Sequence, residues 1–533
     1  MANSLWAVPL QLSNFNVTLA LLGGFVSLFG LVSFLIKEHF YLSEALISLL
    51  VGVAFGPRGA NFIRPKDYAE CRWDGVSEAE CRDNLNDITL NFSRLVLGVQ
   101  LVLAGVQLPS RYLVTECKSL LLLIGPGMTL IVWLVVGTPS FLQALAVGAC
   151  VTPTDPVLSA VIVKGKFADQ NIPKDLQDLI VAESGTNDGL GYPFLFFALY
   201  LIKFLGPGAT SGGASDAMGL WFALTWSYII LLSIVYGAVV GFLGRELLHW
   251  AERRNYVDRE SFLVFSIALA LFVTGTCGLI GTDDVLACFI AGNTFTWDDW
   301  FRVQTKDDSL QPTMDMLLNV TIFLWYGASL PWDAFSANSV PHLSSWRLIV
   351  LGVLVLLLRR LPWVYGMHRW IHQIRGARQA VFVGFFGPIG VSAVFYLFIS
   401  LEFIEKHLSV DGIARSDVEH LGETIRVVVW FLVVCSVVVH GLSIPLGKLG
   451  YLAPKTFAFV RTESISRQHL MGKTRVKVPT WRKWLRLGDP DIQSALTQDT
   501  VCDESPIVAW PGNLGRDTPS RASGSPPSYG SIT

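Results

Sequence analysis

The feature that most constrains this chain is a series of apolar runs, each long enough to cross a membrane. A hydrocarbon core of about 30 Å requires about 20 apolar residues in a spanning helix. Charged residues make up 15% of the 533 residues, against about 25% in an average soluble protein. So few charges cannot cover a water-facing surface, and the net charge of -2 does not attract polyanions. These properties exclude a set of soluble domains, a disordered chain and a nucleic-acid binder, and they predict a membrane protein.

The apolar runs are continuous and do not alternate with polar residues, which predicts helices rather than a β-barrel. We expect an all-α polytopic membrane protein with about 13 transmembrane helices, given the length that one span requires. The predicted spans are residues 16–36, 42–57, 87–107, 118–138, 141–163, 176–203, 219–243, 260–279, 283–296, 314–330, 346–366, 379–400 and 424–447.

The distribution of Lys and Arg between the spans predicts the orientation. Three connections are basic: 164–174, 245–259 and 369–378. They alternate with connections 205–218 and 331–345, which contain no Lys or Arg, and with the mainly acidic loop 402–423. Because basic connections stay in the cytoplasm, we expect the N-terminus outside and the C-terminus in the cytoplasm.

Two of the eight cysteines, Cys71 and Cys81, lie in the polar connection between the second and third spans. The predicted topology places this connection outside, where disulfides persist. We hypothesise that they form a disulfide; the alternative is two unpaired, solvent-exposed thiols.

The composition changes near the end of the last span, which divides the chain into a transmembrane domain at 1–450 and two cytoplasmic segments. Residues 451–488 are basic and aromatic, with nine Lys or Arg against the single Glu463 between 455 and 486. This stretch either lies on anionic lipid as an amphipathic helix or is a solvated tail whose charges enforce the topology. Residues 489–533 are rich in Ser, Pro, Gly and Asp, which predicts a disordered tail.

Helix-breaking residues interrupt two spans near their middle. The fifth contains Thr152-Pro-Thr-Asp-Pro156, and the twelfth contains Gly384-Phe-Phe-Gly-Pro-Ile-Gly390. Each broken span is followed by one last span, so the chain reads as an inverted repeat of spans one to six and eight to thirteen. Unwound backbone at membrane depth is tolerated only beside protein or a watery cavity, and paired breaks are typical of a transporter's binding site. The alternative is a pair of packing kinks.

The sixth span carries the densest polar patch, with Glu183, Ser184, Asn187 and Asp188 within six residues. Ser184 and Asp188 share one helix face, and Glu183 and Asn187 share the next. At about 1.5 Å per residue, Asp188 lies about 20 Å into its span, a depth comparable to that of Asp155. We therefore expect the two carboxyl groups to meet near the midplane.

The oxygens of Thr154, Asp155, Ser184 and Asp188 are hard ligands suited to a small alkali cation such as Na⁺, and no His or Cys cluster accompanies them. Desolvation favours the protonated carboxyl, so one aspartate can hold either a proton or a cation. That exclusion is the physical basis of antiport. We expect no cofactor, with Na⁺, Li⁺ or K⁺ and H⁺ as transported ions.

Other polar residues in the spans have competing interpretations. Glu183 needs a partner, and Arg359 or Arg360 lies at a matched depth, although both arginines could instead snorkel to the headgroups. Thr282-Asp283-Asp284 opens the ninth span either as an N-cap or as an outer, accessory cation site. His440 and Arg94 are interpreted as a satisfied bundle histidine and a snorkelling arginine.

Thr152-Pro-Thr-Asp-Pro156, Glu183-Ser-Gly-Thr-Asn-Asp188 and Arg359-Arg-Leu-Pro362 resemble the sodium/proton antiporter family, most closely the fungal plasma-membrane alkali-metal cation/proton antiporters. The resemblance covers about residues 15–450. It implies a homodimer whose protomers have a dimerisation part and a core part with crossed, unwound fifth and twelfth helices.

The resemblance also implies residue roles. Asp188 would exchange proton and cation, with Thr154, Asp155, Ser184 and Asn187 at the same site. Glu183 would pair with an arginine, with Arg359 favoured over Arg360. The twelfth span lacks the arginine of the mammalian motif, which favours the fungal branch.

Rival functions use the same carboxyl groups. A cation channel would not need alternating access. The paired breaks favour alternating access and therefore argue against a channel. A symporter for a small anion could use half-helix N-termini, but two acids at the breaks oppose anions. An intramembrane enzyme is least favoured, because no nucleophile with a paired base is present.

Overall fold

The computed structural model describes residues 13–34, 42–69, 71, 77–124, 140–163, 168, 172–209, 212–340, 343–410 and 413–443. The predicted juxtamembrane segment 451–488 and tail 489–533 lie outside the described residues.

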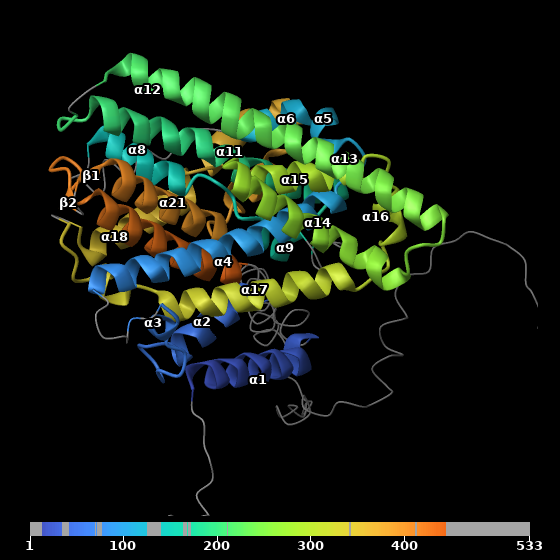
Figure 1. The fold of residues 1–533 in the computed structure, drawn as a ribbon, viewed down its shortest axis with the longest axis horizontal. Coiled ribbons are helices and arrows are strands. Elements are labelled where there is room, and N and C mark those ends of the chain that lie inside the picture. The colour runs from blue at the N-terminus through green and yellow to red at the C-terminus, as the bar shows by residue number, and fades with distance from the viewer. Residues whose placement is uncertain are drawn as a thin grey trace, which may run out of the picture. The chain divides into compact units, whose positions relative to one another are not determined.

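Helices make up nearly all of the regular structure (Figure 1). The α-helices are α1 (Asn14–Phe34), α2 (Glu44–Phe55), α3 (Pro65–Tyr68), α4 (Glu78–Gln107), α5 (Tyr112–Thr115), α6 (Cys117–Leu123), α8 (Phe141–Cys150), α9 (Pro156–Val163), α11 (Lys174–Leu205), α12 (Ala214–Leu220), α13 (Leu232–Arg253), α14 (Arg259–Ile280), α15 (Asp284–Phe295), α16 (Trp300–Gln304), α17 (Leu310–Ser329), α18 (Ser345–Leu358), α19 (Leu361–Met367), α20 (Ala377–Phe385) and α21 (Val391–His407). A π-helix, η2 (Trp221–Leu231), joins α12 to α13, and η3 (Trp332–Phe335) and η4 (His368–Trp370) are 3₁₀ turns. A last helix spans Leu421–Ser443. Two short antiparallel strands, β1 (Ser409–Val410) and β2 (Ile413–Ala414), follow α21.

The observed helices match the predicted spans. A helix occupies each predicted range, although only residues 118–124 of the fourth span lie among the described residues. The longest continuous helical stretch is Ala214–Arg253, which is longer than the predicted seventh span. Its π-helical middle and its outer face carry exposed large hydrophobic side chains, as expected for a surface that contacts lipid.

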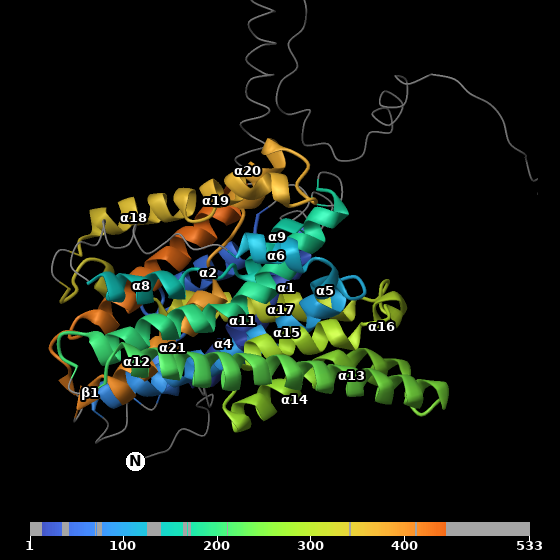
Figure 2. The ribbon, with the colours of Figure 1, turned by 90° about the horizontal axis from the view of Figure 1, so that it is seen from above.

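Close packing between helices depends on small residues. α2 packs against α17 and α4 packs against α15, in agreement with Figures 1 and 2. At the first contact, a Cβ on Gly52 would lie 3.0 Å from the Cα of Gly327 and still closer to the Leu324 carbonyl. Lipid tails are as apolar as the surfaces of these helices, so the helices associate through close van der Waals contacts of this kind.

The extramembrane connection before α4 contains the two cysteines that the sequence singled out. A disulfide joins Cys71 to Cys81, at the first turn of α4.

Among the described residues, three of the predicted spans are interrupted. α8 ends at Cys150 and α9 begins at Pro156, and α20 ends at Phe385 and α21 begins at Val391. The third interruption divides the predicted span 346–366 at Arg359 and Arg360, between α18 and α19. Pro362 has no N–H to donate to the carbonyl four residues earlier, which explains why the helix breaks there.

Candidate functional site

The two predicted breaks meet and cross. The Asp155 N–H donates to the Pro388 carbonyl at 2.9 Å, so the unwound segment of one half is hydrogen bonded to that of the other. Pro153, Pro156 and Pro388 cannot donate backbone hydrogen bonds, and this keeps both segments out of helical geometry. Pro156 stands at the first position of α9, where a missing N–H costs nothing.

The Asp155 carboxylate lies at the N-termini of two half-helices. It accepts from the Leu158 N–H of α9 at 2.9 Å and from the Val391 N–H of α21 at 3.0 Å. Each helix N-terminus carries about half a positive charge, so two of them roughly balance one carboxylate. Asp155 therefore caps the crossing electrostatically as well as by hydrogen bonds.

Arg359 occupies the opposite position, at the C-terminal ends of the other two half-helices. Its guanidinium donates to the Val151 carbonyl, at the end of α8, at 2.6 Å, and to the Gly387 carbonyl beyond α20. These carbonyls have no helical donor, and the C-terminal dipoles favour a cation. Asp155 thus compensates the helix N-termini at the crossing and Arg359 compensates the helix C-termini, and each residue contacts both halves of the chain.

Thr154 connects the crossing to α11. The Asn187 amide oxygen accepts from the Thr154 N–H at 3.0 Å, and its nitrogen donates to the Thr154 hydroxyl at 2.8 Å. The Ser184 and Thr154 hydroxyl oxygens are 3.2 Å apart, and Ser184 also donates to the Ser159 hydroxyl at 3.0 Å. Both ends of the Asn187 amide are used on Thr154, so Asn187 holds the unwound segment in place.

Asp188 is fully buried on α11, one residue beyond Asn187. Within the described part of the chain, neither of its carboxyl oxygens has a hydrogen-bond partner. Asp155 and Asp283 are acidic neighbours that act on it electrostatically. The Tyr396 hydroxyl, from α21, donates to the backbone carbonyl of Asp188 and fixes this turn of the helix. A carboxyl group held in this way is open to a proton or a small cation.

Glu183 forms a buried ion pair with Arg360, with side chains 2% and 8% exposed. The sequence left Arg359 and Arg360 both open as partners and favoured Arg359, but the structure pairs Glu183 with Arg360. The break at Arg359–Arg360 turns the two guanidinium groups to different partners, so that Arg359 binds the carbonyls and Arg360 binds the carboxylate. Neither arginine snorkels, since both are buried.

The three residues at the start of the ninth span, Thr282, Asp283 and Asp284, have different environments. Asp283 caps α15 by accepting from the Leu286 N–H at 3.0 Å, while its second oxygen and the Thr282 hydroxyl are buried without a partner in the described residues. Asp284 pairs with Arg94 of α4 at 3.0 Å, so the interpretation of Arg94 as a snorkelling residue was wrong. His440 hydrogen bonds to Ser436 and to the Phe385 carbonyl, as expected for a satisfied histidine.

Tyr396 and Ser159 belong to the site and were not predicted. Both are almost fully buried and lie on the half-helices α21 and α9 that follow the two breaks. Their position could have identified them. In a helix that begins after a break, the side chains are tilted toward the N-terminus of the helix and therefore toward the break.

Crossed, broken helices beside a buried, unpartnered carboxyl group define a membrane transporter of the inverted-repeat class. The sodium/hydrogen exchanger transmembrane family model matches residues 24–446. The chain belongs to this family and is a multi-pass helical membrane protein.

Individual relatives agree with this assignment. Na⁺/H⁺ antiporter 2 of Zygosaccharomyces rouxii is 35% identical over 85% of this chain and 55% of its own length. A probable Na⁺/H⁺ antiporter of Schizosaccharomyces pombe is 37% identical over 83% of this chain and 57% of its own length. The chain therefore spans little more than half the length of these relatives. The sodium proton antiporter MjNhaP1 of Methanocaldococcus jannaschii shares the fold, with a TM-score of 0.55 and 17% identity over 81% of this chain and 98% of its own.

Proposed function

We propose that this protein is a secondary antiporter that exchanges Na⁺ or Li⁺, with K⁺ as a further substrate, for H⁺ by alternating access. The names of the relatives support an exchange of Na⁺ for H⁺. The observation that carries the proposal is Asp188, whose two carboxyl oxygens are buried and lack partners in the described residues. A proton or an alkali cation would satisfy that group, and one would exclude the other.

The neighbouring residues take complementary roles in this proposal. Ser184 and Thr154 supply hydroxyl oxygens, and Asp155 supplies negative charge while it caps both half-helices. Asn187 positions Thr154, and the Glu183–Arg360 pair is structural. Thr282, Asp283 and Asp284 form an accessory acidic group, in which Asp283 acts on Asp188 at a distance. The carrier needs no cofactor and catalyses no covalent reaction.

The test is exchange in proteoliposomes, read by a pH-sensitive dye on addition of Na⁺, Li⁺ or K⁺. Asp188→Asn keeps the shape of the side chain but cannot release a proton, so cation-dependent proton flux should be lost. Asp175→Asn is the matched control, because it removes an exposed carboxylate from the same helix, and it should exchange like the wild type. Exchange by Asp188→Asn at the wild-type rate would refute the role of Asp188. A turnover above about 10³ s⁻¹, beyond the common enzyme-like range, would instead support a channel.

We further propose a plasma-membrane location, with the N-terminus outside and the C-terminus in the cytoplasm, because the basic connections alternate with loops that lack Lys and Arg. Residues 1–450 form the transmembrane domain of a homodimer in the lipid bilayer, as the resemblance implies. The basic segment 451–488 is proposed to bind anionic lipid.

A further inference from the structure

The side-chain oxygens proposed above for the cation all come from the first half of the chain. They belong to Thr154 and Asp155, at the break between α8 and α9, and to Ser184 and Asp188, on α11. Asp155 and Asp188 are both fully buried, and Asp155 acts electrostatically on Asp188. A further oxygen ligand would have to reach these two carboxyl groups from another element.

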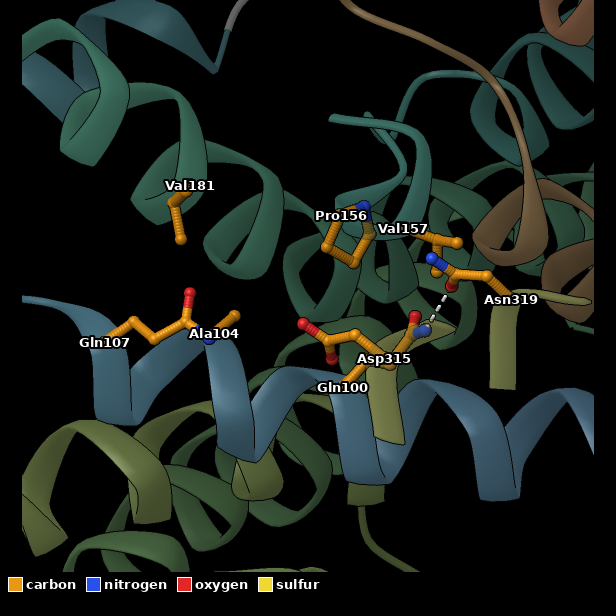
Figure 3. A pocket seen from close by; sticks show the side chains of 8 residues that line it. All are labelled: Gln100, Ala104, Gln107, Pro156, Val157, Val181, Asp315 and Asn319. Atoms are coloured by element: carbon orange, nitrogen blue, oxygen red, sulfur yellow. Dashed lines mark hydrogen bonds between the residues drawn. The ribbon is translucent and has the colours of Figure 1, made fainter. Parts of the chain in front are cut away.

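One space next to this group of residues is too small to supply such a ligand. A cavity of about 20 Å³ lies between α4, α9, α11 and α17, with Pro156 and Val181 in its wall (Figure 3). A water molecule needs about 10–15 Å³, so the cavity has room for about one water and not for a hydrated cation. The described residues that line it come from those four helices and not from α21. The α21 side of the crossing is therefore the better source.

Ser392 reaches the two carboxyl groups from α21, in the second half of the chain. It is the second residue of that half-helix and is 1% exposed. Its hydroxyl donates to an Asp155 carboxyl oxygen at 3.5 Å, which is longer than an ordinary O–H···O hydrogen bond. The same hydroxyl interacts with the Asp188 carboxyl group, although neither oxygen of Asp188 has a hydrogen-bond partner in the described residues. A hydroxyl oxygen has lone pairs besides its one hydrogen, so Ser392 can bind a cation while it faces a carboxylate.

Tyr396 holds this face of α21 against α11. It lies four residues beyond Ser392, so the two side chains share a helix face. The Tyr396 hydroxyl donates to the backbone carbonyl of Asp188 and lies 3.4 Å from that of Gly189. Pro193, inside α11, has no N–H to donate to the Gly189 carbonyl, which leaves this turn of the helix open to a side-chain donor. Tyr396 thus sets how far Ser392 lies from Asp188.

We propose that Ser392 is a further ligand of the transported alkali cation, contributed by the second half of the chain. The inference rests on the proposed antiport function. When a cation is held between Asp155 and Asp188, the Ser392 hydroxyl oxygen replaces part of its hydration shell. This oxygen is a hard ligand, like the hydroxyl oxygens of Thr154 and Ser184.

The experiment measures cation-dependent proton flux by Ser392→Ala in proteoliposomes. Loss of one neutral oxygen ligand should raise the KM for Na⁺ about three- to tenfold, comparable to the loss of one hydrogen bond. The KM for Li⁺ should rise more than the KM for K⁺, because a smaller cation gives up its hydration shell less readily. The maximal rate at saturating cation should stay within about twofold of wild type, since the lost contact contributes to binding. Unchanged KM values for all three cations would overturn the proposal.

Ser400→Ala is the matched control, because Ser400 is also buried on α21, about two turns further on, and donates to the Tyr396 carbonyl of its own helix. It should keep the wild-type KM, and an equal rise would show a general effect of removing a hydroxyl from α21 and overturn the ligand role. Ser392→Cys keeps nearly the same size but replaces the hard oxygen with a soft sulfur, so it should resemble Ser392→Ala. A wild-type KM in Ser392→Cys would show that Ser392 acts by packing and would overturn the proposal. If Ser392→Ala does not fold, Ser392→Cys decides.

Tyr396 is a positioning residue, and its coupling to Ser392 can be measured. Tyr396→Phe removes the hydroxyl that holds the Asp188 turn and should raise the KM for Na⁺ while the maximal rate stays near wild type. Because it acts through Ser392, most of this rise should disappear when Ser392→Ala is already present. Independent, multiplying rises in KM would overturn the positioning role.

Wild-type vesicles run in parallel separate the two hypotheses. Absence of cation-dependent proton flux in well-folded wild type refutes the antiport function itself. Normal wild-type exchange together with an unchanged KM in Ser392→Ala refutes only the role of Ser392.

Discussion

Double substitution tests the buried ion pair between Glu183 and Arg360. If the two residues form a pair, the second substitution should restore stability that the first one removed; if they are independent, it should lower stability further. Glu183→Gln leaves a buried guanidinium without its counter-charge, and Arg360→Met leaves a buried carboxylate in the same position. Combining the two substitutions removes both charges. We expect each single variant to be strongly destabilised and the double variant to recover most of the loss.

The magnitude follows from burial. With side chains 2% and 8% exposed, neither charge left alone is solvated by water. Breaking such a pair costs about 3–5 kcal/mol, whereas replacing both partners with neutral groups is often close to neutral. For a domain of this size the entropy of unfolding per residue converts that cost into a decrease of about 4–6 °C in the apparent unfolding temperature. The double variant should lie within about 2 °C of wild type.

The buried cysteines provide the assay. Cys150, Cys277 and Cys288 are free and buried, so a thiol-reactive dye reports their exposure as purified protein is heated in detergent. Cys117 is exposed and contributes a constant background signal. Because unfolding of a membrane protein is generally irreversible, all variants are compared at one heating rate.

Additive losses in the double variant would refute the pairing. Arg359→Met is the control, because Arg359 donates to the Val151 and Gly387 carbonyls and not to Glu183. Its destabilisation should persist when Glu183→Gln is added. Rescue by Glu183→Gln of Arg359→Met, but not of Arg360→Met, would exchange the roles of the two arginines.

Two further predictions concern other positions. A Cβ on Gly390 would lie 2.5 Å from a carboxyl oxygen of Asp155 and 2.9 Å from a methyl carbon of Leu158, so Gly390→Ala should lower stability by about 1–3 kcal/mol and slow exchange, measured by the same dye and flux assays. Gly366→Ala, with nothing within 4 Å, should be neutral. The Ser261 hydroxyl and N–H hold the pKa of Asp258, the N-cap of α14, below its ordinary value. The stabilisation is therefore present above the unfolded pKa and lost as pH falls through the folded pKa. The loss of unfolding temperature caused by Asp258→Ala should become smaller as the pH falls below the ordinary pKa of aspartate, while Asp258→Asn should retain the cap; a loss that does not vary with pH would contradict this account.

The sequence predicted the two breaks because their chemistry is local. Proline cannot donate a backbone hydrogen bond, so the segments around Pro153, Pro156 and Pro388 could be identified as breaks without tertiary information. The polar patch on the sixth span was also visible, since Ser184 and Asp188 are four residues apart and share a face. Both predictions rest on covalent geometry and helix periodicity.

Side-chain partners were not predictable in the same way. The choice between Arg359 and Arg360 depends on how the interruption before Pro362 rotates two adjacent guanidinium groups, and a one-residue difference reverses the answer. Arg94 was interpreted as an isolated residue because its partner, Asp284, is 190 positions away. Long-range pairing is set by packing, which the pattern of one segment does not contain.

The arrangement of charge at the crossing explains why we assign the proposed exchange of proton and cation to Asp188 and not to Asp155. Asp155 accepts from two backbone N–H groups at two helix N-termini, so both of its oxygens already have partners within the protein. Arg359 compensates the opposite helix ends, and Arg360 and Glu183 compensate each other. Of the buried carboxyl groups in the described residues, Asp188 alone leaves both oxygens without a hydrogen-bond partner. In the proposed antiporter, a transported proton or cation would satisfy these two oxygens.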